Sequence, residues 1–518
     1  MFGIEPVGRT RPGGNPPIAF SQDRTIESTP ISHPNPHTCA AMATRDSWVS
    51  NVGFVLAAIG SAAGLGNIWR FPWLTAGNGG SAFLVVYLLI VVGVGVPGLL
   101  AEFVLGRLGR QTPIGALRSL TGSRWGSALG VFNVATALVL LSFYSVVGGW
   151  TLRYVLASPS GAYFDQPQQY FGAASHGLEA VGFHLLFLGI VAAIVLFGVS
   201  RGIERASKVM LPAVVLLLVG LAGWTAMQPG TDAGYAFYLG FDAEYLAANV
   251  TNVVGPAAGQ ALFTLSLGTG AMLTYASYLD EDVSLPRDTL VIAISNTFIG
   301  VLAGLVVIPL LFSQGIDPGQ GGPGTLFVAL ATAFASLPGG SVLATSFFGA
   351  VLLAAVTSGI NLLETPVGTL VDRLDVSRRR ATVLTTLLVA VTGTGLSLAG
   401  SAFQFVSGTL ADLLLSVGLF GFLAIVGWLL RGEAIAEFRA GAGRFAPLAE
   451  PWLLTVGWVL PVVVLFSLTN TLASLAGVSL GLGVRAIVAV VGTTCCRLAV
   501  TTRTDDLRDL QRSLRSLR

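Results

Sequence analysis

The sequence predicts an all-α integral membrane protein with about twelve transmembrane helices, in which helices 1–5 and 6–10 form an inverted repeat and helices 1 and 6 are broken. Three observations predict this fold class. Of the 518 residues, 53% are hydrophobic and only 10% are charged, whereas about one-quarter of the residues of a soluble domain are charged. Long apolar runs recur at lengths close to the ~20 residues that cross a bilayer. Two of these runs are interrupted by clustered glycines.

The apolar runs define the expected spans in chain order, and Arg485 interrupts the last of them. The expected spans cover residues 50–76, 81–106, 126–156, 181–199, 207–228, 254–278, 289–313, 341–371, 381–399, 404–430, 451–473 and 475–497.

The charges of the loops indicate the orientation of the chain. Lys and Arg gather after spans two, four, eight and ten and in the C-terminal tail, whereas loops 158–180, 229–250 and 314–340 contain neither residue. Because basic loops stay on the cytoplasmic side, we expect a multi-pass protein of the plasma membrane with both termini in the cytoplasm. This orientation requires an even number of spans.

Composition divides the chain into four regions. Residues 1–44, rich in Pro, Thr and Ser, are expected to form a disordered cytoplasmic tail in which Met42 is an alternative start. Residues 45–430 hold spans one to ten, residues 431–500 hold spans eleven and twelve, and residues 501–518 form a basic cytoplasmic tail. The net charge of +2 indicates no nucleic-acid partner, and we expect the partner of the apolar surface to be the lipid bilayer.

Two glycine-rich stretches, GSAAGLGNIWRFP (60–72) and SLGTGA (266–271), interrupt spans that lie five apart. Paired breaks of this kind point to an inverted repeat with a binding site at the breaks. Broken helix is tolerated in hydrocarbon only where other groups satisfy the backbone, so the freed carbonyls can bind a cation and the freed N–H groups a carboxylate. Alternatively, Gly60 and Gly64 form a GxxxG packing face, which explains neither Asn67 nor the second break.

Polar side chains in otherwise apolar spans are candidate ligands, because a small hard cation needs several oxygen atoms. Each also has a structural explanation: hydroxyls can bond to the preceding helical turn, an amide can bond between helices, and a tyrosine can donate to a backbone carbonyl. The residues alone leave these alternatives open. The candidates are Thr264, Ser266, Asn296, Thr357, Ser358 and Tyr144.

Five motifs together closely resemble the neurotransmitter:sodium symporter family, above all its prokaryotic amino-acid branch, which includes the bacterial leucine transporter. They are GSAAGLGNIWRFPW (60–73), NGGSAF (78–83), SFYSVVGGWTL (142–152), FTLSLGTGAMLTYASYL (263–279) and AAVTSGINLLE (354–364). The match covers roughly residues 45–430, in the family's order and spacing. It implies a leucine-transporter-like fold and a sodium-coupled symporter that imports a neutral amino acid by alternating access.

The resemblance implies two sodium sites and a substrate site. The first sodium site would use Ala62, Asn67, Thr264 and Asn296, and the second Gly60, Ala63, Ala354, Thr357 and Ser358. The substrate would contact Ala62, Leu65, Gly66, Leu140, Tyr144, Phe263, Thr264, Ser266, Thr269, Ser358 and Leu362. Monoamine carriers of the family have an aspartate at the position of Gly64, so the resemblance favours an amino acid, and a bulky aliphatic or aromatic one is our interpretation.

The resemblance also implies gates and leaves chloride open. The inner gate would use Arg45, Trp48, Tyr278 and Asp372, and the outer gate Arg70 and Phe263. Where the family has an aspartate to pair with Arg70, this chain has residues 404–407 (QFVS), so we expect an outer gate mediated by water or Gln404. Four of the five residues that hold chloride in relatives are matched, by Tyr87, Gln260, Thr264 and Asn296, and the fifth position is Gly300.

Other functions remain as alternatives. A non-transporting amino-acid sensor of the same fold would bind its ligand without sodium-driven accumulation, and a passive channel would conduct steadily. An enzyme is not expected, because His33, His37, His176 and His184 show no spacing that indicates a catalytic or metal site. The sequence leaves a monomer and a homodimer equally open. It also leaves Glu102 and Glu364 as intramembrane acids that we expect at the cytoplasmic margin, paired or protonated.

Overall fold

The computed structural model describes residues 47–281, 283–316, 324–478 and 480–516. The chain divides into two units, Met1–Arg45 and Asp46–Arg518, and the second is described below. The predicted N-terminal tail, the alternative start at Met42 and the gate residue Arg45 lie outside the described residues. Within those residues the secondary structure is entirely helical.

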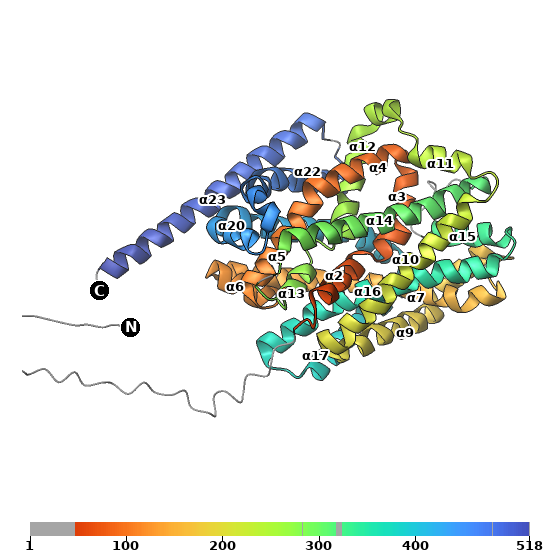
Figure 1. The fold of residues 1–518 in the computed structure, drawn as a ribbon, viewed down its shortest axis with the longest axis horizontal. Coiled ribbons are helices and arrows are strands. Elements are labelled where there is room, and N and C mark those ends of the chain that lie inside the picture. Colours follow the sequence, from red (N-terminus) through yellow and green to blue (C-terminus); the bar gives the residue numbers. More distant parts are fainter. Residues whose placement is uncertain (1–46, 282, 317–323, 479, 517–518) are drawn as a thin grey trace, which may run out of the picture. The chain divides into compact units, whose positions relative to one another are not determined.

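The helices of the first half begin with a short broken pair (Figure 1). They are α2 (Asn51–Ala62), η1 (Gly66–Arg70), α3 (Phe71–Gly77), α4 (Ser81–Ile90), η2 (Val91–Gly95), α5 (Val96–Gly109), α6 (Pro113–Thr121), α7 (Arg124–Ala157), η3 (Ser158–Ser160), α8 (Pro167–Ser175), α9 (Gly177–Leu196), η4 (Val199–Ile203), α10 (Glu204–Ala226) and α11 (Asp232–Leu239).

The helices of the second half begin with another broken pair. They are α12 (Ala243–Thr264), α13 (Ala271–Ala276), α14 (Leu285–Ser313), α15 (Thr325–Ala335), α16 (Gly340–Leu374), α17 (Arg378–Leu398), α18 (Gly400–Phe405), η5 (Val406–Leu410), α19 (Ala411–Ala424), η6 (Ile425–Leu429), α20 (Arg431–Arg439), η7 (Gly443–Leu448), α21 (Ala449–Leu454), η8 (Thr455–Val459), α22 (Leu460–Leu475) and α23 (Leu482–Ser516).

In the described part of the chain, ten helices are long and apolar enough to cross a membrane, and the bent pair 51–62 and 66–77 makes eleven. Twelve spans were expected, and the expected sixth span is the one that does not meet these criteria. It consists of α12, an unwound stretch and the six-residue α13, so it is not one continuous apolar helix. The last expected span and the basic tail form a single helix, α23.

The first break lies between α2 and η1, as the sequence predicts. The chain leaves the helix at Ala63 and Gly64 and re-enters it at Leu65, and the two halves are bent by 43°. A Cβ atom at Gly64 would lie 2.1 Å from the Ser358 hydroxyl oxygen and 2.5 Å from the Tyr144 hydroxyl oxygen. Glycine is therefore required here because neighbouring side chains occupy the space of a side chain.

The second break, residues 265–270, is held by side chains from two other spans. The Gly268 amide donates to Oε1 of Glu102 at 2.5 Å, and its carbonyl accepts from Nδ2 of Asn133 at 2.7 Å. Both side chains are fully buried. Glu102, which the sequence left without an assigned partner, therefore supports backbone that hydrocarbon could not satisfy.

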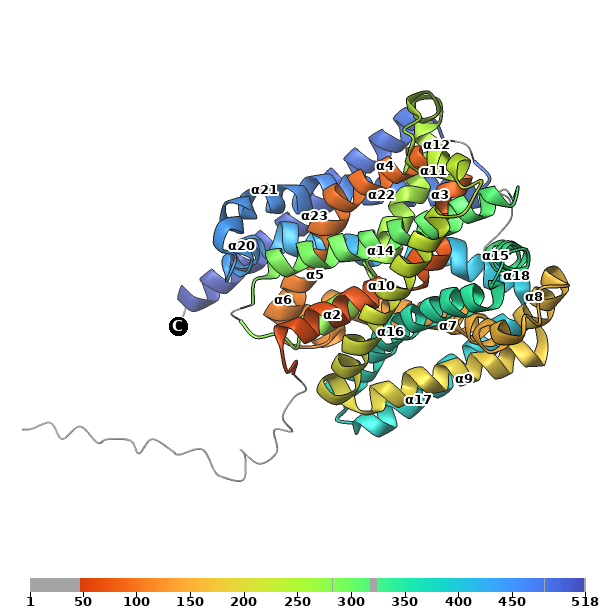
Figure 2. The ribbon, with the colours of Figure 1, turned by 45° about the vertical axis from the view of Figure 1, so that its right-hand side comes forward.

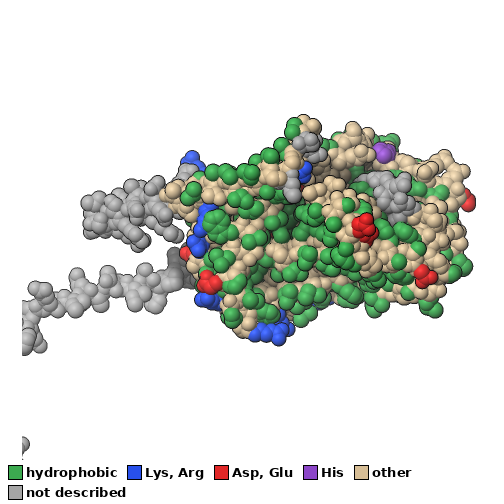
Figure 3. Space-filling model, turned by 90° about the horizontal axis from the view of Figure 1, so that it is seen from above, with side chains coloured by type: hydrophobic (Ala, Val, Ile, Leu, Met, Phe, Trp, Pro, Cys, Tyr) green, Lys and Arg blue, Asp and Glu red, His purple; other side chains and the backbone are tan. Residues whose placement is uncertain are grey.

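The helices pack so that the two breaks meet. In Figures 1 and 2, α7, α9, α16 and α17 lie side by side, and α10 packs against α2 and α16. The second broken pair packs on α4 (α12) and α5 (α13), and it also contacts the first pair, α12 at η1 and α3 and α13 at α2. The helix α22 packs on α23. Hydrophobic side chains cover much of the face in Figure 3, and its Lys and Arg gather toward one end. This distribution is that of a multi-pass membrane protein.

We expect replacement of Gly268 by alanine to destabilise the fold. Gly268 has φ +85°, and its Cβ atom would lie 2.1 Å from the Leu415 carbonyl oxygen. Strain at such a position costs about 1–3 kcal/mol, and the overlap adds to it. Thermal unfolding in detergent would show a lower midpoint for Gly268→Ala. The control is Gly189→Ala on α9, where a Cβ meets nothing within 4 Å, and equal midpoints for the two variants would contradict the prediction.

Candidate functional site

A small cavity of about 20 Å³ lies where the two breaks meet spans three and eight. Leu65, Thr264 and Thr269 are not among its lining residues, and the other residues predicted to bind the substrate are. The sequence prediction missed Ser61, a small hydroxyl residue directly before the first break. The lining residues are Ser61, Ala62, Gly64, Gly66, Leu140, Tyr144, Phe263, Ser266, Ser358 and Leu362. None of them is charged.

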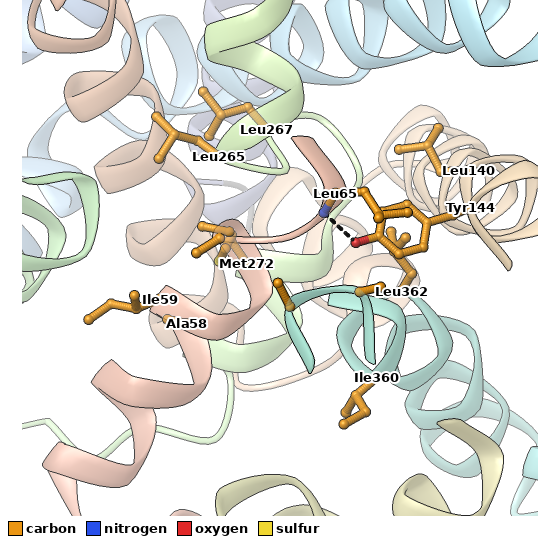
Figure 4. Close-up of a cluster of buried hydrophobic side chains, with 14 of the residues drawn as sticks. Ala58, Ile59, Leu65, Leu140, Tyr144, Leu265, Leu267, Met272, Ile360 and Leu362 are labelled. Atoms are coloured by element: carbon orange, nitrogen blue, oxygen red, sulfur yellow. Dashed lines mark hydrogen bonds between the residues drawn. The ribbon is translucent and has the colours of Figure 1, made fainter. Parts of the chain in front are cut away.

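Tyr144 joins α7 to the first break. Its hydroxyl oxygen accepts from the Leu65 amide at 3.0 Å. Figure 4 shows this bond, with Leu140 and Leu362 beside the tyrosine ring. The backbone partner of the Tyr144 hydroxyl is thus an N–H group. The sequence had allowed a backbone carbonyl as its partner. The hydroxyl can still donate its own hydrogen to an acceptor such as a carboxylate.

Three side chains of the predicted first sodium site lie together in the fully buried interior. The Thr264 hydroxyl donates to Oδ1 of Asn67 at 2.8 Å, and Nδ2 of Asn67 donates to Oδ1 of Asn296 at 3.0 Å. These side chains come from α12, η1 and α14 and are at most 1% exposed. The fourth member, Ala62, offers a carbonyl that accepts from the Gly64 amide at 3.0 Å.

The predicted second sodium site spans the facing segments of α2 and α16. The Ser358 hydroxyl lies 3.2 Å from the Gly60 carbonyl oxygen and 2.6 Å from that of Ser61, and donates to them. The Thr357 hydroxyl donates to the Ala354 carbonyl at 2.9 Å. Ala63, the remaining member, ends α2 and is buried. The structure therefore gathers hydroxyl and carbonyl oxygens here without any carboxylate.

Thr269 was predicted to face the substrate, but it does not line the cavity. Its hydroxyl donates to the Ser266 carbonyl at 2.7 Å and accepts from the Ala271 amide at 3.0 Å. It therefore caps the start of α13 inside the second break. Sequence reasoning could not separate this role from pocket lining, because both need a buried residue beside the break.

The end of the bundle marked by Trp48, here called the Trp48 end, is closed by aromatic contacts. Nε1 of Trp48 donates to the Tyr275 carbonyl at 3.0 Å, and the two rings pack edge to face at 5.2 Å. Trp48 is 8% exposed. Of the other predicted gate residues, Asp372 accepts from the Thr112 amide at 3.0 Å.

Glu364, left without a partner by the sequence, is paired at the same end. Tyr278 donates its hydroxyl to Oε1 of Glu364 at 3.0 Å, and Arg378 forms an ion pair with Oε2. The carboxylate is fully buried, so its charge requires this pairing. Tyr278 thus contacts an acid that sequence reasoning had not assigned to the gate.

The opposite end, marked by Arg70, has a partner that we had not expected. The Arg70 guanidinium lies 3.1 Å from Oδ2 of Asp412 and 4.8 Å from the centre of the Phe263 ring. The expectation of a water- or Gln404-mediated gate is therefore wrong. Asp412 lies at the start of α19, after the π-helical turn η5, five to eight positions beyond residues 404–407, where the family motif led us to look for the acid.

Phe263 separates the inner cavity from a wider outer one. It lines the cavity at the breaks and also one of about 500 Å³ beside Arg70, Trp69 and Gln404. The same ring therefore forms part of the wall of both spaces.

The four candidate chloride residues are buried beside the first break. Nε2 of Gln260 donates to the Gly66 carbonyl at 2.7 Å. Thr264 and Asn296 belong to the first polar cluster, and Tyr87 is fully buried. At Gly300, a Cβ atom would lie 3.4 Å from Nδ2 of Asn67, so the missing fifth group would face this same cluster. Chloride binding here remains a prediction.

The chain is similar to known proteins over most of its length. A model of the sodium:neurotransmitter symporter family matches residues 45–168 and 158–426. The uncharacterized sodium-dependent transporter YhdH of Bacillus subtilis is 31% identical over 446 residues, which is 83% of this chain and 98% of that protein. The uncharacterized sodium-dependent transporter MJ1319 of Methanocaldococcus jannaschii is 32% identical over 461 residues, 83% of this chain and 92% of the relative.

A more distant relative and a solved structure agree with these matches. The sodium-dependent dopamine transporter of Bos taurus is 28% identical over 402 residues, 67% of this chain and 57% of that protein. The crystal structure of MhsT in complex with L-phenylalanine has a TM-score of 0.75 and 32% identity, and the match covers 82% of this chain and 100% of that one. With its helical architecture, its two breaks and its sequence, the chain belongs to the sodium:neurotransmitter symporter family.

Proposed function

We propose that this protein is a sodium-coupled symporter that imports a neutral amino acid by alternating access. The observation that carries the proposal is the cavity at the two breaks, which is lined by uncharged residues and flanked by two clusters of uncharged oxygen ligands. A zwitterion brings one carboxylate and one ammonium group, so it needs no ionised side chain as a counter-charge if a cation binds beside it.

The two ends of the substrate would be recognised by different groups. The amides that follow the first break, near Leu65 and Gly66, and the Tyr144 hydroxyl suit the carboxylate, because freed N–H groups at a helix start attract anions. The carbonyls of Ala62, Phe263 and Thr264 and the Ser266 hydroxyl suit the ammonium group. The side chain would lie among Leu140, Phe263 and Leu362, which line the cavity.

Coupling follows from shared ligands. If the substrate carboxylate completes the shell of the first sodium ion, each ligand raises the affinity of the other, and the effect is reciprocal. Entry of one net positive charge across 100 mV adds about 2.3 kcal/mol of driving force. We propose two sodium ions, because the second cluster at Thr357 and Ser358 lies apart from the first.

A bulky aliphatic or aromatic amino acid is the proposed substrate. The cavity walls are Leu140, Leu362 and the Phe263 ring, and a Cβ at Gly64 would meet two hydroxyl oxygens, so an aspartate for a monoamine has no room. The complex of the similar MhsT holds L-phenylalanine. The basic loops support the proposed orientation with both termini in the cytoplasm.

Sodium-driven uptake tests the proposal. In proteoliposomes with an inward sodium gradient, radiolabelled phenylalanine or leucine should accumulate above its external concentration, and replacing external sodium by choline should abolish accumulation. Competition by each of the twenty amino acids would then identify the substrate. Saturable binding without accumulation would support the sensor instead, and uptake that is equal in sodium and choline would contradict coupling.

Removal of the Thr357 hydroxyl should weaken sodium dependence. Thr357→Ala removes one neutral oxygen ligand, so the sodium concentration for half-maximal uptake should rise several-fold, and roughly tenfold if the loss is near 1.4 kcal/mol. The matched control is Thr345→Ala on the same helix, whose hydroxyl bonds only to the Ser341 carbonyl in the described structure. An unchanged sodium response in Thr357→Ala would remove this residue from the ion site.

Tyr144→Phe should raise the KM for the amino acid with less effect on the amount of folded protein. The change removes the proposed hydrogen bond to the substrate carboxylate, worth ~1.5–3 kcal/mol when the acceptor is charged, and also the acceptor of the Leu65 amide, so affinity should fall at least tenfold. The control is Tyr163→Phe, because Tyr163 is equally buried but bonds to Ser158, away from the cavity. Unaltered affinity in Tyr144→Phe would exclude the hydroxyl from the substrate site.

A further inference from the structure

The first residues of span one are held by a carboxylate of span five. Glu204 is the first residue of α10 and is 1% exposed. Its Oε2 accepts from the Val49 amide at 2.8 Å, and its Oε1 accepts from the Ser50 hydroxyl at 2.9 Å. The Ser50 hydroxyl in turn caps α2 by accepting from the Gly53 amide at 3.0 Å. One side chain therefore binds the freed donors at the start of α2.

Gly53 permits the close approach of the two helices. A Cβ atom at this position would lie 2.1 Å from Oε1 of Glu204 and 2.2 Å from its carboxyl carbon. Any larger residue must displace the carboxylate. The contact between α2 and α10 thus depends on the shape of Gly53 as well as on the charge of Glu204.

Lys208 keeps the carboxylate paired from within its own helix. Its Nζ lies 2.6 Å from Oε1 of Glu204, one helical turn away, and the lysine side chain is 41% exposed. An isolated buried charge would be costly. Because Lys208 belongs to α10, it can stay with Glu204 when α2 moves away. The contact with α2 can therefore break without leaving the carboxylate unpaired.

Trp48 attaches the same segment to the other side of the bundle, where it bonds and packs against Tyr275 near α13. Residues 48–50 are therefore tied to span six by an indole and to span five by a carboxylate. We propose that Glu204 is a positioning residue that holds α2 against α10 while the Trp48 end is closed and releases α2 when that end opens. This inference rests on the proposed alternating-access function.

Cysteine accessibility tests this role in the full-length protein in proteoliposomes. In a background in which Cys39, Cys495 and Cys496 are replaced by serine, Ser277→Cys reports on the Trp48 end, since Ser277 is buried two residues after Tyr275. Ser407→Cys, in the wall of the outer cavity, reports on the Arg70 end. Glu204→Gln should make the inner cysteine react roughly tenfold faster with a polar maleimide in sodium, which is the change expected from weakening a charged hydrogen bond, and should slow the outer one.

A second variant separates position from charge. Gly53→Ala leaves every charge in place but displaces the carboxylate, and alanine normally stabilises a helix interior, so it should shift accessibility in the same direction as Glu204→Gln. The control is Glu281→Gln, which removes an exposed glutamate paired with Arg110 and should leave both rates unchanged. If either variant raised inner reactivity without lowering outer reactivity, the change would be local loosening, and the inference would be wrong.

The parent protein distinguishes the inference from the proposed function. If sodium shifts the two cysteine rates of the parent in opposite directions while Glu204→Gln and Gly53→Ala match the parent, the role of Glu204 is refuted and alternating access stands. If sodium shifts neither rate in the parent, the proposed transport function itself fails. The positioning role would be established by two results together. Sodium shifts the two cysteine rates of the parent in opposite directions, and both variants have a faster inner cysteine and a slower outer cysteine than the parent.

Discussion

Peptide groups that two interrupted helices leave without helical partners are the constraint on which the rest of this structure depends. In the interior of a membrane protein each such group needs a partner, and the partners come from other spans. Tyr144 accepts from the amide after the first break, and Glu102 and Asn133 bind the Gly268 peptide in the second. These contacts determine where α5, α7 and the broken pairs must lie relative to one another, and the cavity is the space that they leave.

Charge is distributed in agreement with this constraint. The cavity and its two flanking clusters contain only neutral side chains, so in the proposed function the carboxylate of the zwitterion would be the anionic partner of a bound cation. The ion pairs Arg70–Asp412, Glu364–Arg378 and Glu204–Lys208 lie away from the cavity.

The pairs differ in how readily they could open. Asp412 is 29% exposed in its side chain, and pairs in contact with water contribute only about 0–1 kcal/mol, which would suit a contact that breaks in the proposed transport cycle. Glu204 and Glu364 are at most 1% exposed, and breaking a buried pair by removing one partner is far more costly. In the proposed opening, Glu204 would keep Lys208 as its partner, because both belong to α10, and the bonds that Glu204 and Lys208 make to residues 49 and 50 would be lost.

The sequence by itself determined the class of fold, the two breaks, the family and most of the cavity lining, because apolar runs and glycine clusters act locally and the family motifs are short and contiguous. Only the tertiary structure decided the partners of buried polar groups. Asp412 pairs with Arg70 from the start of α19, the Thr269 hydroxyl accepts from the Ala271 amide at the start of α13, and Glu102 accepts from the Gly268 amide from another span. The partners of Arg70 and Glu102 are far away in the sequence, and their identity depends on helix rotation and packing, which no local pattern of residues encodes. The partners of Thr269 are local, but its orientation depends on how the second break unwinds.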